Sequence, residues 1–218
     1  MASKDWARWH EQYDDPASPL SVRLALVRAH LANAITAAPP GTLRLVSLCA
    51  GQGHDVIGVL PVHPRRDDVT AVLVEADARN AGLARERAAQ AGLTSIEVRQ
   101  ADAGLTANYA DALPADVLLL CGIFGNVSPD DIHATATAAA PMCRPGGTVI
   151  WTRHRRAPDL TPLVRSWFAE AGFDEVAFER PATANLISVG VHRLSACAAV
   201  PATALAAPAD RLFTFLAS

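Results

Sequence analysis

Five short, continuous apolar runs constrain the fold of this 218-residue chain more than any other feature. They lie at residues 43–49, 69–75, 95–100, 115–121 and 147–152. Strands that lack polar alternation are buried on both faces, which is typical of a parallel sheet covered by helices. Helical stretches separate the runs, at 20–37 ahead of the first, at 78–91, at about 129–142, and from 161 until Gly172. The pattern predicts an α/β fold.

Local signals mark where several of these elements begin and end. Asp77 is the expected N-cap of the helix at 78–91, and Gly92 is the residue expected to end it. The sequence Pro145-Gly146-Gly147 predicts a turn that leads into the fifth run. At roughly 100 to 200 residues per domain, the chain is long enough for one domain with a large core.

The first run passes directly into a glycine turn, and the second ends in an acidic residue. The turn is Cys49-Ala50-Gly51-Gln52-Gly53, and the acid is Glu75. Gly51 and Gly53 lack the Cβ that would keep a ligand away from the backbone, and a helix that begins near His54 would direct its N–H groups toward the same place. Glu75 would accept hydrogen bonds from ribose hydroxyls. This pairing predicts a nucleotide-like ligand.

The residue after the turn narrows the choice of ligand. A dinucleotide fingerprint requires a third small residue where this chain has Val56. The turn therefore suits an adenosine without a phosphate, as in S-adenosylmethionine. At these residues, and at Ile96–Asp102 after the third run, the chain resembles the class I S-adenosylmethionine-dependent methyltransferases over about residues 43–193.

The resemblance implies a Rossmann-like, seven-stranded, mostly parallel sheet with helices on both faces, closed by an antiparallel pair at 176–178 and 186–191. It also implies that Asp102 meets the adenine amino group. The family usually carries Asp or Glu where this chain has Ser47, so Asp55 is expected to take over the contact to the methionine ammonium. The cofactor contacts predicted in this way are Ser47, Cys49, Ala50, Gly51, Gly53, Asp55, Glu75, Ala76, Asp102, Ala103 and Gly122.

Polar residues follow the fourth and fifth runs, where an open parallel sheet binds its ligands. His154 is the predicted general base, because its ordinary pKa lies near neutrality. Arg153 and Arg155, with Arg156 beside them, are predicted to hold a carboxylate or phosphate of the acceptor. The alternative is that this loop carries charge only because it is solvated.

Two residues after the fourth run are also expected at the reaction centre. Asn126 would orient the nucleophile as a second catalytic residue, and Phe124 would contact the substrate and exclude water. The alternative for Asn126 is a helix N-cap or turn residue. Asn126 does not belong to the Asn-Pro-Pro-aromatic motif of methyltransferases that act on DNA bases.

The termini lie outside the predicted S-adenosylmethionine-binding domain at 43–194. Residues 1–42 form the predicted N-terminal helical lid, in which Trp6, Trp9 and Tyr13 either pack the first helix or close over the substrate, with Tyr13 as a substrate contact. Residues 195–218 are the predicted tail, a linker that ends in the apolar residues 212–216. That anchor binds either this chain or a partner.

Composition excludes several classes of protein. The net charge is −3 and the isoelectric point about 6.1, so the chain lacks the basic surface that nucleic-acid binding requires. It has no signal peptide and no apolar run of the roughly 18 residues that a membrane span needs, so we expect a cytoplasmic protein that binds no membrane. The four cysteines show no Cys-x-x-Cys pairing, which indicates neither disulfides nor a metal site.

The sequence therefore predicts a methyltransferase that uses S-adenosyl-L-methionine and acts on a small-molecule acceptor at oxygen or nitrogen, with a homodimer left open. One alternative keeps the cofactor but not the reaction, as in a regulator or a cyclase. An NAD(P)-dependent oxidoreductase is disfavoured by Val56 and by the absence of a Tyr-x-x-x-Lys pair, since the only lysine is Lys4. A protein or RNA methyltransferase would need a recognition domain or a basic face, and the sequence indicates neither.

Overall fold

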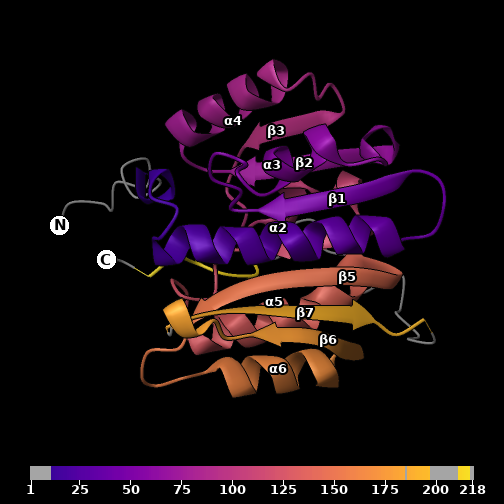
Figure 1. The fold of residues 1–218 in the computed structure, drawn as a ribbon. Coiled ribbons are helices and arrows are strands. Elements are labelled where there is room, and N and C mark those ends of the chain that lie inside the picture. Colours follow the sequence, from indigo (N-terminus) through magenta and orange to yellow (C-terminus); the bar gives the residue numbers. More distant parts are fainter. Residues whose placement is uncertain (1–10, 185, 197–210, 217–218) are drawn as a thin grey trace.

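A single seven-stranded sheet forms the centre of the computed structural model, which describes residues 11–184, 186–196 and 211–216. The strand order is β3-β2-β1-β4-β5-β7-β6 (Figure 1). The strands are β1 (Leu43–Leu48), β2 (Val69–Glu75), β3 (Ile96–Gln100), β4 (Ala115–Leu120), β5 (Cys143–His154), β6 (Phe173–Glu179) and β7 (Ile187–Leu194). Only β7 runs against its neighbours β5 and β6. The predicted seven-stranded, mostly parallel sheet and its closing antiparallel pair are confirmed.

Helices cover both faces of this sheet. Helices α2, α3 and α4 contribute to the apolar core on one face, and α5 and α6 contribute to the core on the other. The α-helices are α2 (Pro19–Ala37), α3 (Val56–Val59), α4 (Ala78–Gln90), α5 (Pro129–Met142) and α6 (Thr161–Glu170). The 3₁₀ turns are η1 (Glu11–Asp14), η2 (Leu60–Val62), η3 (Arg66–Asp68), η4 (Thr106–Asn108), η5 (Ala110–Ala112) and η6 (Ala182–Ala184). Asp77 is the N-cap of α4, as predicted, since its side chain accepts the N–H of Asn80 at 2.8 Å.

Two local predictions differ from the structure. Strand β5 begins at Cys143, so the expected turn at 145–147 is an irregularity within the strand, where the pairing with β4 shifts register. The helix expected to begin near His54 is α3, which has only four residues. Pro61 follows it and has no N–H to continue the α-helical pattern. So short a helix has little dipole to direct toward the glycine turn.

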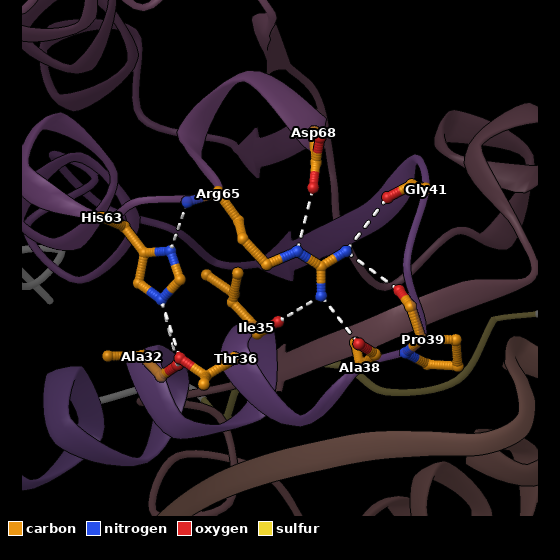
Figure 2. A network of polar contacts seen from close by, with 9 residues as sticks. All are labelled: Ala32, Ile35, Thr36, Ala38, Pro39, Gly41, His63, Arg65 and Asp68. Atoms are coloured by element: carbon orange, nitrogen blue, oxygen red, sulfur yellow. Dashed lines mark hydrogen bonds and ion pairs between the residues drawn. The ribbon is translucent and has the colours of Figure 1, made fainter.

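The end of α2 is fastened to the chain ahead of β2 by Arg65. Its guanidinium donates to four carbonyl oxygens, those of Ile35 at 2.8 Å, Ala38 at 2.7 Å, Pro39 at 2.9 Å and Gly41 at 3.1 Å (Figure 2). The last carbonyls of a helix have no partner within the helix, and a cation is favourable at this end of its dipole. Arg65 therefore satisfies the end of α2 and the turn into β1 together.

Both described ends of the chain lie at the end of the sheet toward which β1 points (Figure 1). Leu212 and Phe213 are buried against this chain, so the apolar anchor predicted for the tail binds the chain itself. Helix α2 packs on the sheet through Val27, Leu31 and Ile35. Trp6 and Trp9 of the predicted lid lie outside the described residues. No helix in the described part of the chain is both long enough and apolar enough to cross a membrane.

Candidate functional site

The glycine turn after β1 has an unusual backbone conformation. Three of its five residues have left-handed backbone conformations, Cys49 with φ 54°, Gly51 with φ 57° and Gly53 with φ 69°. A Cβ added to Gly53 would lie 2.6 Å from the Cδ1 atom of Ile57, and its positive φ favours glycine at this position. The turn thus depends on glycine for its backbone conformation.

Glu75, the last residue of β2, is bonded to this turn. Its Oε2 atom accepts the N–H of Gly51 at 2.7 Å, and its Oε1 atom accepts the N–H of Asp77 at 2.8 Å. Burial raises the pKa of Glu75, and the backbone hydrogen bonds oppose that shift. An ionised carboxylate has about four lone-pair sites, so Glu75 can still accept a hydroxyl donor beside these backbone groups.

Asp102, after β3, lies beside a tyrosine that the sequence analysis did not select. The Oδ1 atom of Asp102 accepts the N–H of Gly104 at 2.8 Å. Tyr109 is fully buried, and its hydroxyl has no hydrogen-bond partner in the described part of the structure. Burial is the main cause of the raised pKa of Tyr109, and the charges of Cys49 and Asp102 raise it further. This hydroxyl is thus a buried, unsatisfied polar group near Asp102.

Asp55, the N-cap of α3, is a buried carboxylate without a paired cation. Its Oδ1 atom accepts the N–H of Val56 at 2.8 Å, and within the described residues it forms no salt bridge. Burial raises the pKa of Asp55, and the charges of Arg28 and Arg23 act in the opposite direction. A buried carboxylate in this state fits an ammonium ligand. Ser47 is buried within β1, and Asp55 is the first acid that follows it in the sequence.

Tyr13 lies over the start of α3. Its ring centroid is 4.6 Å from that of His54, and its hydroxyl accepts a hydrogen bond from Arg23 at 3.1 Å. The charge of Asp55 contributes to a raised pKa of Tyr13, although burial is the main cause. The guanidinium of Arg87 lies 2.7 Å from the Nε2 atom of His54. Tyr13, predicted as an acceptor contact, is therefore placed beside the predicted ammonium contact.

The remaining predicted cofactor residues lie in the loops that follow four neighbouring strands. These residues are Cys49 and Ala50 after β1, Ala76 after β2, Ala103 after β3 and Gly122 after β4. Sequence reasoning missed Tyr109, Arg23, Arg28 and Arg87. Arg28 donates to the carbonyl of His54 at 2.6 Å and occupies the space above Gly58, where a Cβ would lie 2.3 Å from its Nη2 atom. No local pattern in the sequence indicates such a contact.

The loop after β4 is fixed by its own hydrogen bonds. The N–H of Gly122 donates to the hydroxyl of Thr152 at 2.9 Å, and the amide of Asn126 donates back to the carbonyl of Gly122 at 2.7 Å. Asn126 thus holds the turn, which is the alternative role given to it. Phe124 is fully buried, with its ring centroid 5.9 Å from that of Trp151. The structure places Phe124 in the core, where it has no exposed surface for a substrate.

His154 ends β5 beside the same loop. Its Nδ1 atom accepts the N–H of Arg156 at 3.3 Å, and its ring lies against Gly125, where a Cβ would be 3.2 Å from its Cδ2 atom. Burial lowers the pKa of His154, and the charges of Arg153 and Arg156 lower it further, so the ring is neutral near pH 7. Because Nδ1 accepts a backbone hydrogen bond, the neutral ring carries its proton on Nε2. A role as base requires the contact to Arg156 to open.

The arginines of this loop are held at different points. Arg153 donates a hydrogen bond to the carbonyl of Phe124. The backbone N–H of Arg155 donates to the carbonyl of Leu186 at 2.8 Å, and its Nε donates to that of Ile187 at 3.4 Å. The described residues contain no group of three or more His, Cys, Asp or Glu side chains that would hold a metal ion.

Comparisons by sequence find neither a matching family model nor a matching curated protein. Solved structures are similar in fold. Magnesium protoporphyrin IX methyltransferase (ChlM) from Synechocystis PCC 6803, solved with bound SAM, has a TM-score of 0.68 at 13% identity, over 88% of this chain and 92% of that one. The CurJ carbon methyltransferase has a TM-score of 0.64 at 16% identity, over 88% of this chain and 58% of that one.

An O-methyltransferase family protein from Burkholderia thailandensis has a TM-score of 0.60 at 16% identity, over 87% of this chain and 64% of that one. The chain thus spans less than two thirds of this protein and of CurJ. At these identities the similarity establishes the fold alone, which this chain shares with these methyltransferases. Proteins with this fold include, by name, an O-methyltransferase family protein and a carbon methyltransferase. The fold therefore does not identify the acceptor atom.

Proposed function

We propose that this protein is an S-adenosylmethionine-dependent methyltransferase that acts on a small-molecule acceptor. The observation that carries the proposal is the glycine turn, in which Cys49, Gly51 and Gly53 have positive φ and the Glu75 carboxylate is bonded to the N–H of Gly51 at 2.7 Å. This arrangement places an oriented acid beside a turn in which two residues lack a Cβ. The ChlM structures with bound SAM and SAH have the same fold.

Each part of the cofactor has a matching group in this site. Glu75 retains lone pairs for the ribose hydroxyls, Asp55 has no paired cation and suits the ammonium, and Asp102 suits the adenine amino group. When bound, the cofactor supplies an electrophilic methyl group. The chain's own residues then hold the acceptor in line with it and exclude water.

The acceptor side favours an anion that is methylated at oxygen or nitrogen. Arg153, Arg155 and Arg156 flank His154 in the sequence, and the charges of Arg153 and Arg156 act on its ring. Asp159 is the acid whose charge acts on Arg153. A carboxylate or phosphate on the acceptor would pair with this excess of positive charge. A hydroxyl or amine must lose a proton on methylation, and the neutral His154 ring would accept it at Nδ1 once Arg156 N–H moves away.

One observation supports the alternative that the protein binds S-adenosylmethionine without transferring its methyl group. Ser47 replaces the acid that the family usually carries, and it lies buried in β1 with 1% of its surface exposed. If Asp55 does not replace that acid, the cofactor binds less precisely. The two functions are separated by incubating the protein with labelled cofactor and an acceptor panel of small hydroxy and amino acids, in which a regulator leaves every acceptor unlabelled.

Calorimetric titration with S-adenosylhomocysteine tests the proposal, with NAD and NADP as parallel ligands. Glu75→Gln should weaken S-adenosylhomocysteine binding by about 10- to 150-fold, the equivalent of roughly 1.5–3 kcal/mol for a charge-assisted hydrogen bond. Glu86→Gln on the exposed face of α4 is the matched control and should bind like the wild type. Thermal unfolding of each variant verifies its fold. Equal affinity of Glu75→Gln and wild type, or preferential binding of NAD by the wild type, would refute the proposal.

A further inference from the structure

The C-terminal segment Arg211–Leu216 lies along the loops that follow β3 and β4. Antiparallel bridges join Arg211 to Leu105 and Phe215 to Val127. The N–H of Leu212 donates to the carbonyl of Gly104 at 2.8 Å, and the N–H of Leu216 donates to that of Asn126 at 2.8 Å. In Figure 1 the segment is the yellow trace near the end of the chain, at the end of the parallel strands where the candidate site lies.

Packing fixes the segment in this position. Leu212 is 8% and Phe213 is 2% exposed, and the hydroxyl of Thr135 in α5 donates to the carbonyl of Leu212 at 3.5 Å. A Cβ on Gly104 would lie 2.4 Å from the carbonyl oxygen of Phe213. The loop after β3 therefore carries a glycine where the backbone of the segment approaches it.

The segment brings a cation to the carboxylate predicted to bind adenine. The Nη1 atom of Arg211 lies 3.0 Å from the Oδ2 atom of Asp102, while Oδ1 accepts the N–H of Gly104 at 2.8 Å. One carboxylate oxygen thus accepts a backbone N–H, and the other lies beside the Arg211 cation. Lone pairs remain on both oxygens for an amino group, so the ion pair orients Asp102 without filling it.

Stability alone does not account for this contact. The Arg211 and Asp102 side chains are 45% and 47% exposed, and ion pairs that are this exposed contribute little to stability. Leu212 and Phe213 would anchor the segment without it. The ion pair instead involves Asp102, the side chain of this loop that the sequence predicts as an adenine contact.

We infer that the segment Arg211–Leu216 is part of the cofactor site and that Arg211 is a positioning residue, which orients the Asp102 carboxylate toward the adenine amino group. Arg211 thereby sets the preference for adenine over hypoxanthine, whose ring carries a carbonyl in place of that amino group. The inference rests on the proposed function, because it requires S-adenosylmethionine or its product at this site.

The test compares binding of S-adenosylhomocysteine and S-inosylhomocysteine by calorimetry, with full-length variants. Arg211→Gln should weaken S-adenosylhomocysteine binding about two- to fivefold and reduce the ratio between the two affinities, because an exposed ion pair has an effect of this size. Arg211→Lys keeps the charge and should restore part of both. The control is Arg144→Gln, which removes a 3.5 Å pair to Asp116 near the starts of β4 and β5 and should change neither value.

Two results would overturn the inference while leaving the proposed function intact. One is that Arg211→Gln binds S-adenosylhomocysteine with the wild-type affinity and keeps the wild-type ratio between the affinities for the two ligands. The other is tighter binding by that variant, because Arg211 would then compete with adenine for Asp102. Failure of the wild type to bind S-adenosylhomocysteine at all would overturn the proposed function and this inference with it. A purely structural role would lower the thermal stability of Arg211→Gln and leave the affinity ratio unchanged.

Discussion

Replacing His192 by phenylalanine should stabilise the protein, and by more at acidic pH than at neutral pH. The side chain lies in β7 with 1% of its surface exposed, and neither ring nitrogen has a hydrogen-bond partner among the described residues. Its ring is stacked 4.8 Å from the Phe168 ring and 6.1 Å from the Trp151 ring, measured between centroids. A phenyl ring would keep this stacking and remove two unsatisfied polar atoms.

The magnitude follows from the titration of the imidazole. Burial lowers the pKa of His192 from 6.5 to about 4, with Glu175 opposing the shift and Arg165 adding to it. Because the pKa of His192 in the folded state lies below its value in the unfolded chain, protonation favours the unfolded state. The wild type therefore has its full stability above pH 6.5 and loses part of it as the pH falls toward 4. The loss has an upper bound of about 3 kcal/mol. At neutral pH the phenyl ring should add roughly 1–3 kcal/mol, the cost of leaving a buried polar group unsatisfied.

Urea unfolding at about pH 7.5, 6 and 4.5 measures this effect. His192→Phe should be more stable than the wild type at each pH, and the difference should grow as the pH falls. His133→Phe is the matched control, because His133 is exposed and its ring already packs against Trp167 at 4.9 Å. The reasoning is wrong if His192→Phe loses stability with falling pH as steeply as the wild type, or if it is the less stable protein at pH 7.5.

Two further predictions concern the end of α2 and the proposed cofactor site. Arg65→Met should lower the free energy of unfolding by roughly 2–4 kcal/mol, because four carbonyls lose their donor. Arg66→Met is the control and should have a much smaller effect. Equal losses of stability in urea unfolding of the two variants would contradict this. S-adenosylhomocysteine affinity should rise with pH through the raised pKa of Asp55, because a bound ammonium favours the ionised carboxylate, and Asp55→Asn should abolish that dependence. A wild-type pH profile in calorimetric titrations of Asp55→Asn would remove Asp55 from the site.

The sheet could be predicted from the sequence because its signals are local. Strand β2 spans 69–75 and α5 spans 129–142, the ranges that the apolar run and the helical pattern indicate. Strands buried on both faces have to be continuously apolar, and the helices begin at side chains that accept their first N–H groups, as at Asp77 and Ser128. The closing antiparallel pair, however, came from the resemblance, because periodicity carries no information on which strands pair.

Contacts between distant residues could not be predicted in this way. Arg65 caps a helix that ends 28 residues before it, and Arg211 reaches Asp102 from the other end of the chain. Phe124 follows β4 directly, where an aromatic residue suits a ligand pocket and a core equally well. The structure resolves this through the neighbouring rings of Trp151 and Phe168. Such distinctions depend on packing, which one sequence does not encode in any local pattern.

The orientation of the acids argues for a cationic ligand over a dinucleotide. Glu75, Asp55 and Asp102 each accept a backbone N–H near the loops that would hold the ligand, at 2.7, 2.8 and 2.8 Å, so their carboxylates are oriented before anything binds. Only Asp102 has a paired cation among the described residues. The diphosphate of NAD would bring two negative charges against two unpaired carboxylates, whereas the sulfonium and ammonium of S-adenosylmethionine would be attracted by them. On this reasoning, Asp55→Asn should weaken S-adenosylhomocysteine binding without creating affinity for NAD, because Val56 still occupies the position where a dinucleotide turn needs a small residue.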